Sequence, residues 1–335
     1  MSYVLHVRRT AALTGAGGLI LLGLAACGGS DAGKALPPPS PYGSSPSPSA
    51  SAPYGVSPLT GLPARSPSNA ARPAFGVAVS GSGVSGLADA DVVYEEESAP
   101  VRYLAIYQSR DAGRIGPLGQ GRSTDPQVLG MLHGAVGYTS IRPGPLSQFK
   151  EMGAVDAGLP GHAKAYHSSG GRTYTSTKAM YAALAKAKHK PASAPTLFSY
   201  SSPGKPLAGG KLKKAGSLTV SVPGHGTQHW SYTGGVWKRT GGGPRVSAAN
   251  VVVQHTAYKA TNIAKGGVTA PKAKVFGRGA CQVVSGAQTA RGHWNRQATD
   301  ALMLYVDVHS FPFRFAPGRT WVVLAPPGTT ARTAP

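Results

Sequence analysis

The fold of this chain is decided by residues 90–108, which read ADVVYEEESAPVRYLAIYQ. Residues 92–96 and 102–108 are rich in β-branched and aromatic side chains, and a short connection joins them, so we expect two strands of a hairpin. Successive side chains of a strand point to opposite faces, so Glu95 and Glu97 share one face while Glu96 lies on the other. Arg102 begins the second strand. The hairpin therefore brings glutamates and an arginine together.

Residues 58–195, which include this hairpin, contain patterns typical of both strands and helices. Residues 75–79 predict a further strand. Asp125 and Pro126 predict the start of a helix, with Asp125 as N-cap and the apolar residues of 128–132 facing inward. Residues 176–188 predict a second helix, with apolar residues inward and lysines outward.

Residues 196–327 predict a nearly all-β region. Short apolar runs alternate there with Gly- and Pro-rich turns, and no helical pattern interrupts them. All four tryptophans lie in this region, and we expect them in core and cross-strand packing rather than as platforms for a sugar. The predicted fold class is α+β, in which a mixed N-terminal domain (58–195) precedes a mostly antiparallel C-terminal β domain (196–327). The expected strands are residues 218–222, 229–232, 236–239, 251–256, 274–276, 281–284, 302–308 and 321–324.

The N-terminus has the order of a bacterial lipoprotein signal. Arg8 and Arg9 precede an apolar run at residues 11–26, which ends in Leu-Ala-Ala before Cys27. The run is shorter than the about 20 apolar residues that a membrane-spanning helix needs. We expect residues 1–26 to be a signal peptide, Cys27 to carry the lipid, and the protein to lie anchored on the extracytoplasmic face of the plasma membrane.

Two further segments have biased composition. Residues 28–57 contain seven prolines and eight serines with very few aliphatic side chains, so residues 27–57 predict a disordered tether. Residues 328–335 predict a frayed tail.

The charge is strongly positive and unevenly distributed. The chain has 34 Lys and Arg against 12 Asp and Glu, a net charge of +22. Residues 157–299 contain no acidic residue and 20 basic ones. Such a surface attracts anionic partners, or it serves only solubility and proximity to the membrane. In the envelope these are lipid headgroups or anionic wall polymer, and the location argues against nucleic acid. An envelope protein is a further partner candidate.

The residues that usually carry metal or redox chemistry are few. With Cys27 lipidated, Cys281 has no partner, and we expect it buried and inert. His225 and His229 flank a predicted turn with no carboxylate nearby, so we expect neither a metal nor a cofactor. The common hydrolase, zinc-protease and nucleotide-binding motifs are missing.

An ordered set of motifs resembles the YerB-like family of bacterial lipoproteins, a two-domain family of unknown function. The resemblance implies the architecture and the envelope location, and it supplies no chemistry. The motifs are SPLTGLP at 57–63, RP at 72–73, ADVVYE at 90–95, RYLAIY at 102–107, IGP at 115–117, YTS at 174–176, NVVVQ at 250–254 and PGRTW at 317–321.

The chain departs from the family pattern at three places. The family hairpin usually has Glu-Gly-Gly before Thr-Arg, and here residues 97–102 read ESAPVR. An Arg-Ser-Ala-Arg pattern is reduced to GQGR at residues 119–122. Gly171 and Arg172 stand where the family often has His-Asn. If those polar residues form the family site, this chain lacks part of it.

Five residues form the candidate binding site, namely Glu95, Glu97, Arg102, Arg114 and Arg122. Arginines bind carboxylate or phosphate groups through paired hydrogen bonds, and a nearby glutamate can act as acid, base or cation ligand. The leading hypothesis is a non-catalytic binding or scaffolding module for an anionic envelope ligand. The alternative is a hydrolase or transferase of wall polymer that uses Glu95 or Glu97. A structural ion-pair network is a further explanation of the same residues.

Overall fold

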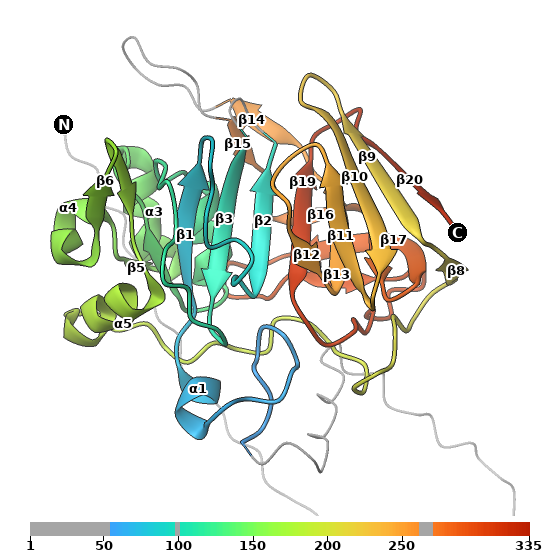
Figure 1. Ribbon diagram of the computed structural model, residues 1–335, viewed down its shortest axis with the longest axis horizontal. Coiled ribbons are helices and arrows are strands. Elements are labelled where there is room, and N and C mark those ends of the chain that lie inside the picture. Colours follow the sequence, from blue (N-terminus) through green and yellow to red (C-terminus); the bar gives the residue numbers. More distant parts are fainter. Residues whose placement is uncertain (1–53, 98–100, 261–270) are drawn as a thin grey trace, which may run out of the picture. The chain divides into compact units, whose positions relative to one another are not determined.

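A computed structural model describes residues 54–97, 101–260 and 271–335. Strands dominate the described chain, and its few helices all lie in the N-terminal half (Figure 1). The described residues contain no helix with the length and apolarity needed to cross a membrane. The helices are α1 (Pro67–Ala71), α2 (Thr124–Gly130), α3 (Pro143–Met152), α4 (Leu159–His162), the 3-10 helix η1 (Ala163–Ala165) and α5 (Thr177–Lys186).

The largest element is an 11-stranded mixed sheet. Its strand order is β18-β17-β16-β13-β19-β2-β3-β1-β4-β5, and β8 pairs with β17 beside this path. The bounds are β1 (Phe75–Ser80), β2 (Val92–Glu96), β3 (Arg102–Tyr107), β4 (Ala135–Gly137), β5 (Val155–Asp156), β8 (Lys213–Lys214), β13 (Asn250–His255), β16 (Gly277–Ser285), β17 (Gln288–Arg296), β18 (Leu304–Val306) and β19 (Thr320–Ala325).

The expected hairpin lies at the middle of this sheet. Strands β2 and β3 pair antiparallel, with Glu96 opposite Arg102. The other neighbour of β2 is β19, which runs parallel to it and places Val323 opposite Glu95. Strands from both sides of the predicted boundary at residues 195 and 196 therefore pair directly, while the division into two domains stays a prediction from the sequence.

A second sheet of five strands has the order β12-β11-β10-β9-β20. Its last strand corrects one expectation, because residues 328–335 are not a frayed tail: Thr330–Ala334 pair along β9. A short, largely polar edge strand leaves almost no hydrophobic signal, which explains the error. The bounds are β9 (Ser217–Val222), β10 (Gly226–Thr233), β11 (Val236–Gly241), β12 (Ser247–Ala248) and β20 (Thr330–Ala334), and two separate two-stranded ribbons are β6 (His167–Ser169) with β7 (Arg172–Tyr174) and β14 (Tyr258–Ala260) with β15 (Pro271–Ala273).

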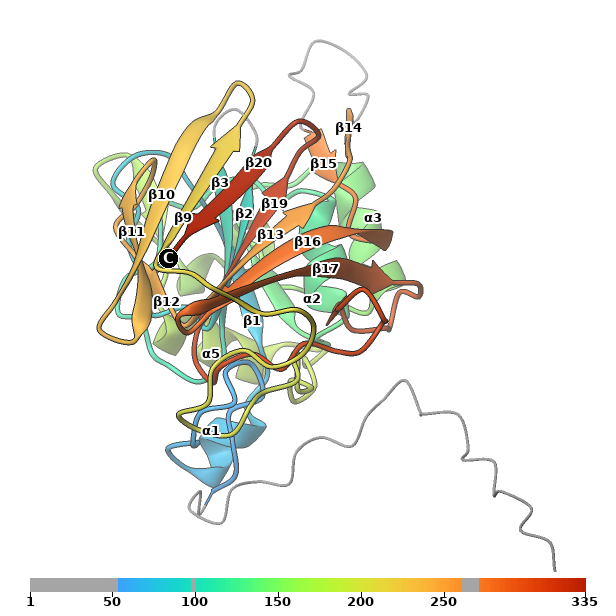
Figure 2. The ribbon, with the colours of Figure 1, turned by 90° about the vertical axis from the view of Figure 1, so that its right-hand side faces the viewer.

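The large sheet separates two hydrophobic cores. On one face, side chains such as Tyr94 and Val322 pack with Leu129 of α2. On the other face, Trp321 and Val93 belong to a core that also contains Trp230 of the second sheet. Figure 2 shows the five-stranded sheet and helices α2 and α3 on opposite sides of the large sheet. Alternate side chains of β2 consequently enter two different cores.

Several expectations are confirmed and several need correction. All four tryptophans are buried, as is Cys281, whose burial raises its thiol pKa to about 12. Helix α5 follows Ser176, whose side chain accepts a hydrogen bond from the Ala179 amide. Helix α2 begins before Asp125 rather than after it, so this aspartate belongs to the first turn and not to the N-cap.

Two of the expected boundaries are also wrong. Residues 274–276 follow a strand instead of forming one, since β15 ends at Ala273. The predicted tether ends earlier than residue 57, because Val56 pairs with Pro63 and Ser57 is buried. Together, the described residues form an N-terminal mixed region and a mostly antiparallel β region in a chain that is mostly sheet.

Candidate functional site

Three consecutive glutamates, the last two residues of β2 and Glu97 directly after it, are all buried. Glu95, Glu96 and Glu97 are only 1%, 2% and 4% exposed. The strand alternation is confirmed: Glu95 and Glu97 point toward the second sheet, and Glu96 points toward α2. A buried carboxylate is costly without a partner, so the contacts of each one decide its role.

Glu95 is held by an arginine and a tryptophan. Arg239 of β11 donates from Nη1 to both carboxylate oxygens, at 3.0 and 3.1 Å, and Trp321 Nε1 donates to Oε2 at 2.7 Å. The Arg239 guanidinium also lies near the rings of Trp230 and Trp321, with its carbon 5.7 and 5.8 Å from their centroids. This buried ion pair therefore connects the two sheets through an aromatic environment.

A glycine pair after β11 fits closely around the guanidinium. The carbonyl of Gly242 accepts a hydrogen bond from Arg239 Nη2. At Gly243, a Cβ atom would lie 2.4 Å from the Arg239 Cζ, and both glycines have positive φ, +71° and +150°. Only glycine satisfies this approach and this backbone conformation at low cost.

Glu96 is the centre of a second network on the opposite face. Arg102 Nη1 and Arg122 Nη1 donate to its Oε2 at 3.0 and 3.2 Å, and Thr124 donates to its Oε1. Arg102 also forms an ion pair with Asp125, which accepts from the Arg122 amide at 2.8 Å. Burial raises the pKa of Asp125, and the charge and hydrogen bond of Arg102 oppose that rise. This network attaches α2 to the hairpin.

Glu97 differs from its neighbours because it forms no ion pair among the described residues. Gln228 of β10 donates to its Oε1 at 2.5 Å, and its backbone amide donates to the Tyr258 hydroxyl at 3.0 Å. Burial, reinforced by the nearby charge of Glu95, raises the Glu97 pKa to about 8, against the opposing effects of Arg239 and Gln228. At neutral pH this side chain is therefore mostly protonated.

Glu95 and Glu97 line a pocket of about 230 Å³ between the two sheets. Its inner part is formed by buried residues, which include both glutamates, Gln228 and Arg239. Exposed residues of the turns beside β10 and β11, such as His225 and Gly242, form its rim. The carboxylates thus lie at the bottom of a pocket with a solvent-exposed rim.

The five predicted site residues do not gather at one place. Arg102 and Arg122 join Glu96 on the face of the sheet away from Glu95 and Glu97. Arg114 is exposed, and its guanidinium carbon lies 3.8 Å from the ring centroid of Tyr174. The lipidation candidate Cys27 lies outside the described residues. The binding roles of the five predicted site residues stay predictions.

Sequence reasoning missed the partners of these carboxylates. Arg239 lies 144 residues from Glu95 in the chain, and Gln228 lies 131 residues from Glu97. Residues 236–239 were expected to form a strand, yet its alternation was not used to separate Arg239 from the neighbouring Lys238. The signal that existed was alternation, because Arg239 shares the inward face of β11 with Trp237.

A larger groove of about 1130 Å³ lies elsewhere on the described molecule. Four basic residues line it, and among the described residues no aspartate or glutamate does. Tyr232 adds an aromatic side chain to the lining. The basic residues are Arg110, Lys205, Lys214 and Arg319.

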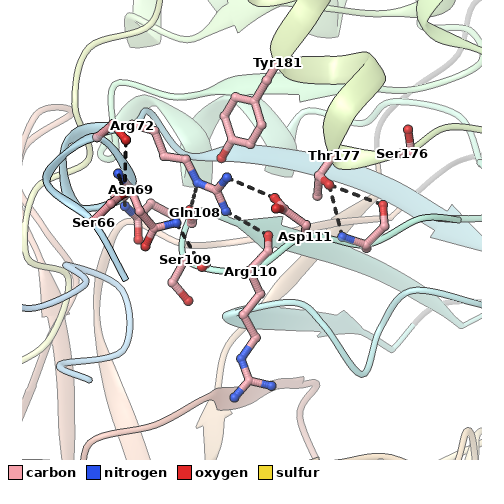
Figure 3. A network of polar contacts seen from close by, with 12 residues as sticks. Ser66, Asn69, Arg72, Gln108, Ser109, Arg110, Asp111, Ser176, Thr177 and Tyr181 are labelled. Carbon is pink, nitrogen blue, oxygen red and sulfur yellow. Dashed lines mark hydrogen bonds and ion pairs between the residues drawn. The ribbon is translucent and has the colours of Figure 1, made fainter. Parts of the chain in front are cut away.

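The loop that carries Arg110 is held in place by a polar network. Arg72 donates to Asp111 at 2.9 Å and to the Arg110 carbonyl at 3.0 Å, while its guanidinium lies 4.7 Å from the ring centroid of Tyr181. The side chain of Arg110 points away from this network (Figure 3). The backbone is thereby fixed while the guanidinium remains available to the groove.

Two guanidiniums of the groove influence each other. Arg319 donates to Ser247 Oγ at 2.9 Å, and burial, followed by the positive charge of Arg110, lowers its pKa. Like charges held together are stabilised by an anion between them. The charges of Asp89 and Asp91 oppose this lowering, while the side chains that line the groove include four basic and, among the described residues, no acidic ones.

Comparisons with known proteins agree with this architecture. The N-terminal domain described as a protein of unknown function (DUF3048) matches residues 59–191, and the C-terminal domain of the same family matches residues 218–322. The chain belongs to the YerB-like DUF3048 family. The crystal structure of the YerB protein from Bacillus subtilis is similar, with a TM-score of 0.67 and 17% identity, over 83% of this chain and 99% of that one. A search of curated proteins gives no match. The YerB structure shares the fold, and both family models are described as domains of unknown function.

Replacing Arg239 with methionine leaves Glu95 as an uncompensated buried charge. We expect the free energy of unfolding to fall by about 3–5 kcal/mol. Chemical denaturation measures this loss. Lys238→Met, at the adjacent exposed position of β11, is the control and should change stability by about 0.5 kcal/mol or less. Similar small losses in both variants would contradict the stabilising role of the pair.

The raised pKa of Glu97 predicts a stability that falls with rising pH. Between its ordinary value of 4.5 and about 8, the unfolded chain has lost the proton that the folded chain keeps, so stability decreases as pH rises through this window and levels off above it. Glu97→Gln removes this dependence, so the variant should gain on wild type by about 1.4 kcal/mol per pH unit within the window. Denaturation curves at pH 5, 7 and 9 measure this difference. If the stabilities of the two proteins change with pH in parallel, Glu97 is ionised in the folded state.

Proposed function

We propose that this protein is a lipid-anchored, non-catalytic binding module for an anionic polymer of the cell envelope. The observation that carries the proposal is the groove of about 1130 Å³, whose lining contains Arg110, Lys205, Lys214 and Arg319 and, among the described residues, no acidic side chain. A phosphate or carboxylate chain lying in it would meet cations along its length. Tyr232 provides an aromatic surface for the uncharged parts of such a polymer.

The use of the acidic residues supports the same proposal. Asp91, Glu95, Glu96 and Asp125 are buried and bonded within the described core. The sequence has only 12 carboxylates, and six of the eleven in the described residues are buried, so little negative charge is left to neutralise the cations of the surface. An external polyanion is the natural counter-charge for the groove.

The location is part of the proposal. The Leu-Ala-Ala-Cys sequence ending at Cys27 supports cleavage and lipidation there, which would hold the protein on the extracytoplasmic face of the membrane. The proline- and serine-rich segment that follows would let the folded part reach wall polymer or neighbouring anionic headgroups. Nucleic acid does not fit this location.

The contacts of Glu95 favour binding over wall-polymer hydrolysis that would use this residue. Both oxygens of Glu95 accept hydrogen bonds from Arg239, and Oε2 also accepts one from Trp321. A nucleophile or general base needs a carboxylate that substrate or water can reach. The arginines first expected to contact the ligand, Arg102 and Arg122, are engaged with Glu96, so we assign the anion contacts to the groove instead.

A charge-matched pair of variants tests the groove. The full-length chain would be compared with Arg110→Gln/Lys205→Gln/Lys214→Gln and with the control Lys178→Gln/Lys186→Gln/Lys238→Gln, which removes the same charge from exposed positions outside the groove lining. Binding to isolated bacterial cell wall, phosphatidylglycerol vesicles and phosphatidylcholine vesicles would be measured by co-sedimentation over a salt series.

We expect the groove variant to lose about 100-fold in affinity for one anionic surface, since each basic residue contributes about 1 kcal/mol near anionic groups. The control should lose much less. Equal losses in both variants would mean diffuse attraction by net charge and would overturn the groove as the site. Preference for wall over phosphatidylglycerol would identify the wall polymer as the ligand, and the reverse preference the headgroups.

A further inference from the structure

Glu97 is an unusual residue in this chain. The sequence has 34 basic residues for 12 acidic ones, yet Glu97 is 96% buried without an ion pair among the described residues. The described hydrogen bonds to its carboxyl group reach Oε1, from Gln228, and leave Oε2 for another donor. It lines the pocket of about 230 Å³ between the sheets. The missing counter-charge is the feature that needs an explanation.

The charges around the pocket do not balance when Glu97 is ionised. Arg239 on β11 faces the pocket, but its Nη1 atom already donates to both carboxylate oxygens of Glu95 on β2. The remaining polar groups that line the pocket are Tyr103 of β3, Gln228 of β10 and His225 of the turn before β10. Among the carboxylate and guanidinium groups of the lining, Arg239 balances Glu95, and an ionised Glu97 leaves one negative charge over.

The donor set does not favour a divalent metal. Calcium takes six to eight oxygen ligands and magnesium needs a near-octahedral set, while this lining offers one carboxylate without an ion pair. No group of three or more acidic, histidine or cysteine side chains suited to a metal occurs in the described part of the chain. A ligand that brings one positive charge and its own hydrogen-bond donors fits the lining better.

We propose that this pocket binds a small molecule or terminal group that carries a protonated primary amine, with the ammonium donating to Glu97. The volume of about 230 Å³ suits a ligand smaller than those of drug-sized pockets, which occupy about 300–1000 Å³. An amino-sugar or amino-acid-sized group belongs to this range. The site is separate from the basic groove and does not depend on the function proposed for it.

Binding in this way exchanges a proton for the ammonium. Because burial and Glu95 raise the Glu97 pKa to about 8, the free pocket is mostly protonated at pH 7. The arriving ammonium keeps its three protons, and the Glu97 carboxyl releases its own proton to solvent. Complex formation at pH 7 therefore releases close to one proton, and the apparent affinity weakens roughly tenfold per pH unit well below pH 8.

Calorimetric titration tests the proposal directly. The full-length chain would be titrated with ethanolamine, and with ethylene glycol as its uncharged analogue, at constant ionic strength. Repeating the ethanolamine titration at pH 7 in two buffers of different ionisation enthalpy gives the number of protons released. Glu97→Gln is the test variant, and Glu151→Gln, at an exposed helical position, is the matched control.

We expect ethanolamine to bind with release of close to one proton and ethylene glycol to bind at least about tenfold more weakly, as the loss of a charged hydrogen bond requires. Glu97→Gln should lose both the binding and the proton release, while Glu151→Gln should keep both. Equal binding of the two compounds, absence of ethanolamine binding, or unchanged proton release in Glu97→Gln would overturn the proposal. None of these outcomes depends on whether the groove binds a polyanion.

Discussion

The structure depends on how a very basic chain uses its few carboxylates at the centre of its largest sheet. Strand β2 points Glu95 into one core and Glu96 into the other, and each meets an arginine from a different element: Arg239 of β11 and Arg102 of β3. These two buried pairs connect the second sheet and helix α2 to the same strand. Buried ion pairs add little over apolar packing, but losing one partner is severe, so they specify which elements belong together.

This internal use of negative charge shapes the surface as well. No aspartate or glutamate is among the described residues that line the groove. Arg110 lowers the pKa of Arg319, and the charges of Asp89 and Asp91 oppose this effect. The carboxyl group of Glu97 accepts a hydrogen bond from the side-chain amide of Gln228 and forms no ion pair among the described residues. Our two proposals assign a polyanion to the basic groove and an ammonium group to the pocket at Glu97. Both follow from one distribution of carboxylates.

Local patterns predicted the elements well and their pairing poorly. The hairpin of β2 and β3, helix α5 and the burial of the tryptophans follow from alternation, helical periodicity and composition, all of which are properties of short segments. The parallel pairing of β19 with β2 joins segments more than 200 residues apart, and nothing local encodes it. For the same reason the glutamates could be recognised as a cluster while Arg239, 144 residues away from Glu95, could not be named as the partner. Strand β17 was missed because its sequence, QTARGHWNR, alternates small, polar and aromatic residues without an apolar run.

The central functional claim is that the groove, and not net charge in general, receives the anion. Nuclear magnetic resonance of the protein with its lysines ¹³C-methylated tests this most directly, during titration with isolated anionic wall polymer. If the anion lies in the groove, the signals of Lys205 and Lys214 shift first and furthest, while those of exposed lysines outside the groove, such as Lys178 and Lys238, stay nearly unchanged. Shifts distributed evenly over the exposed lysines would contradict it.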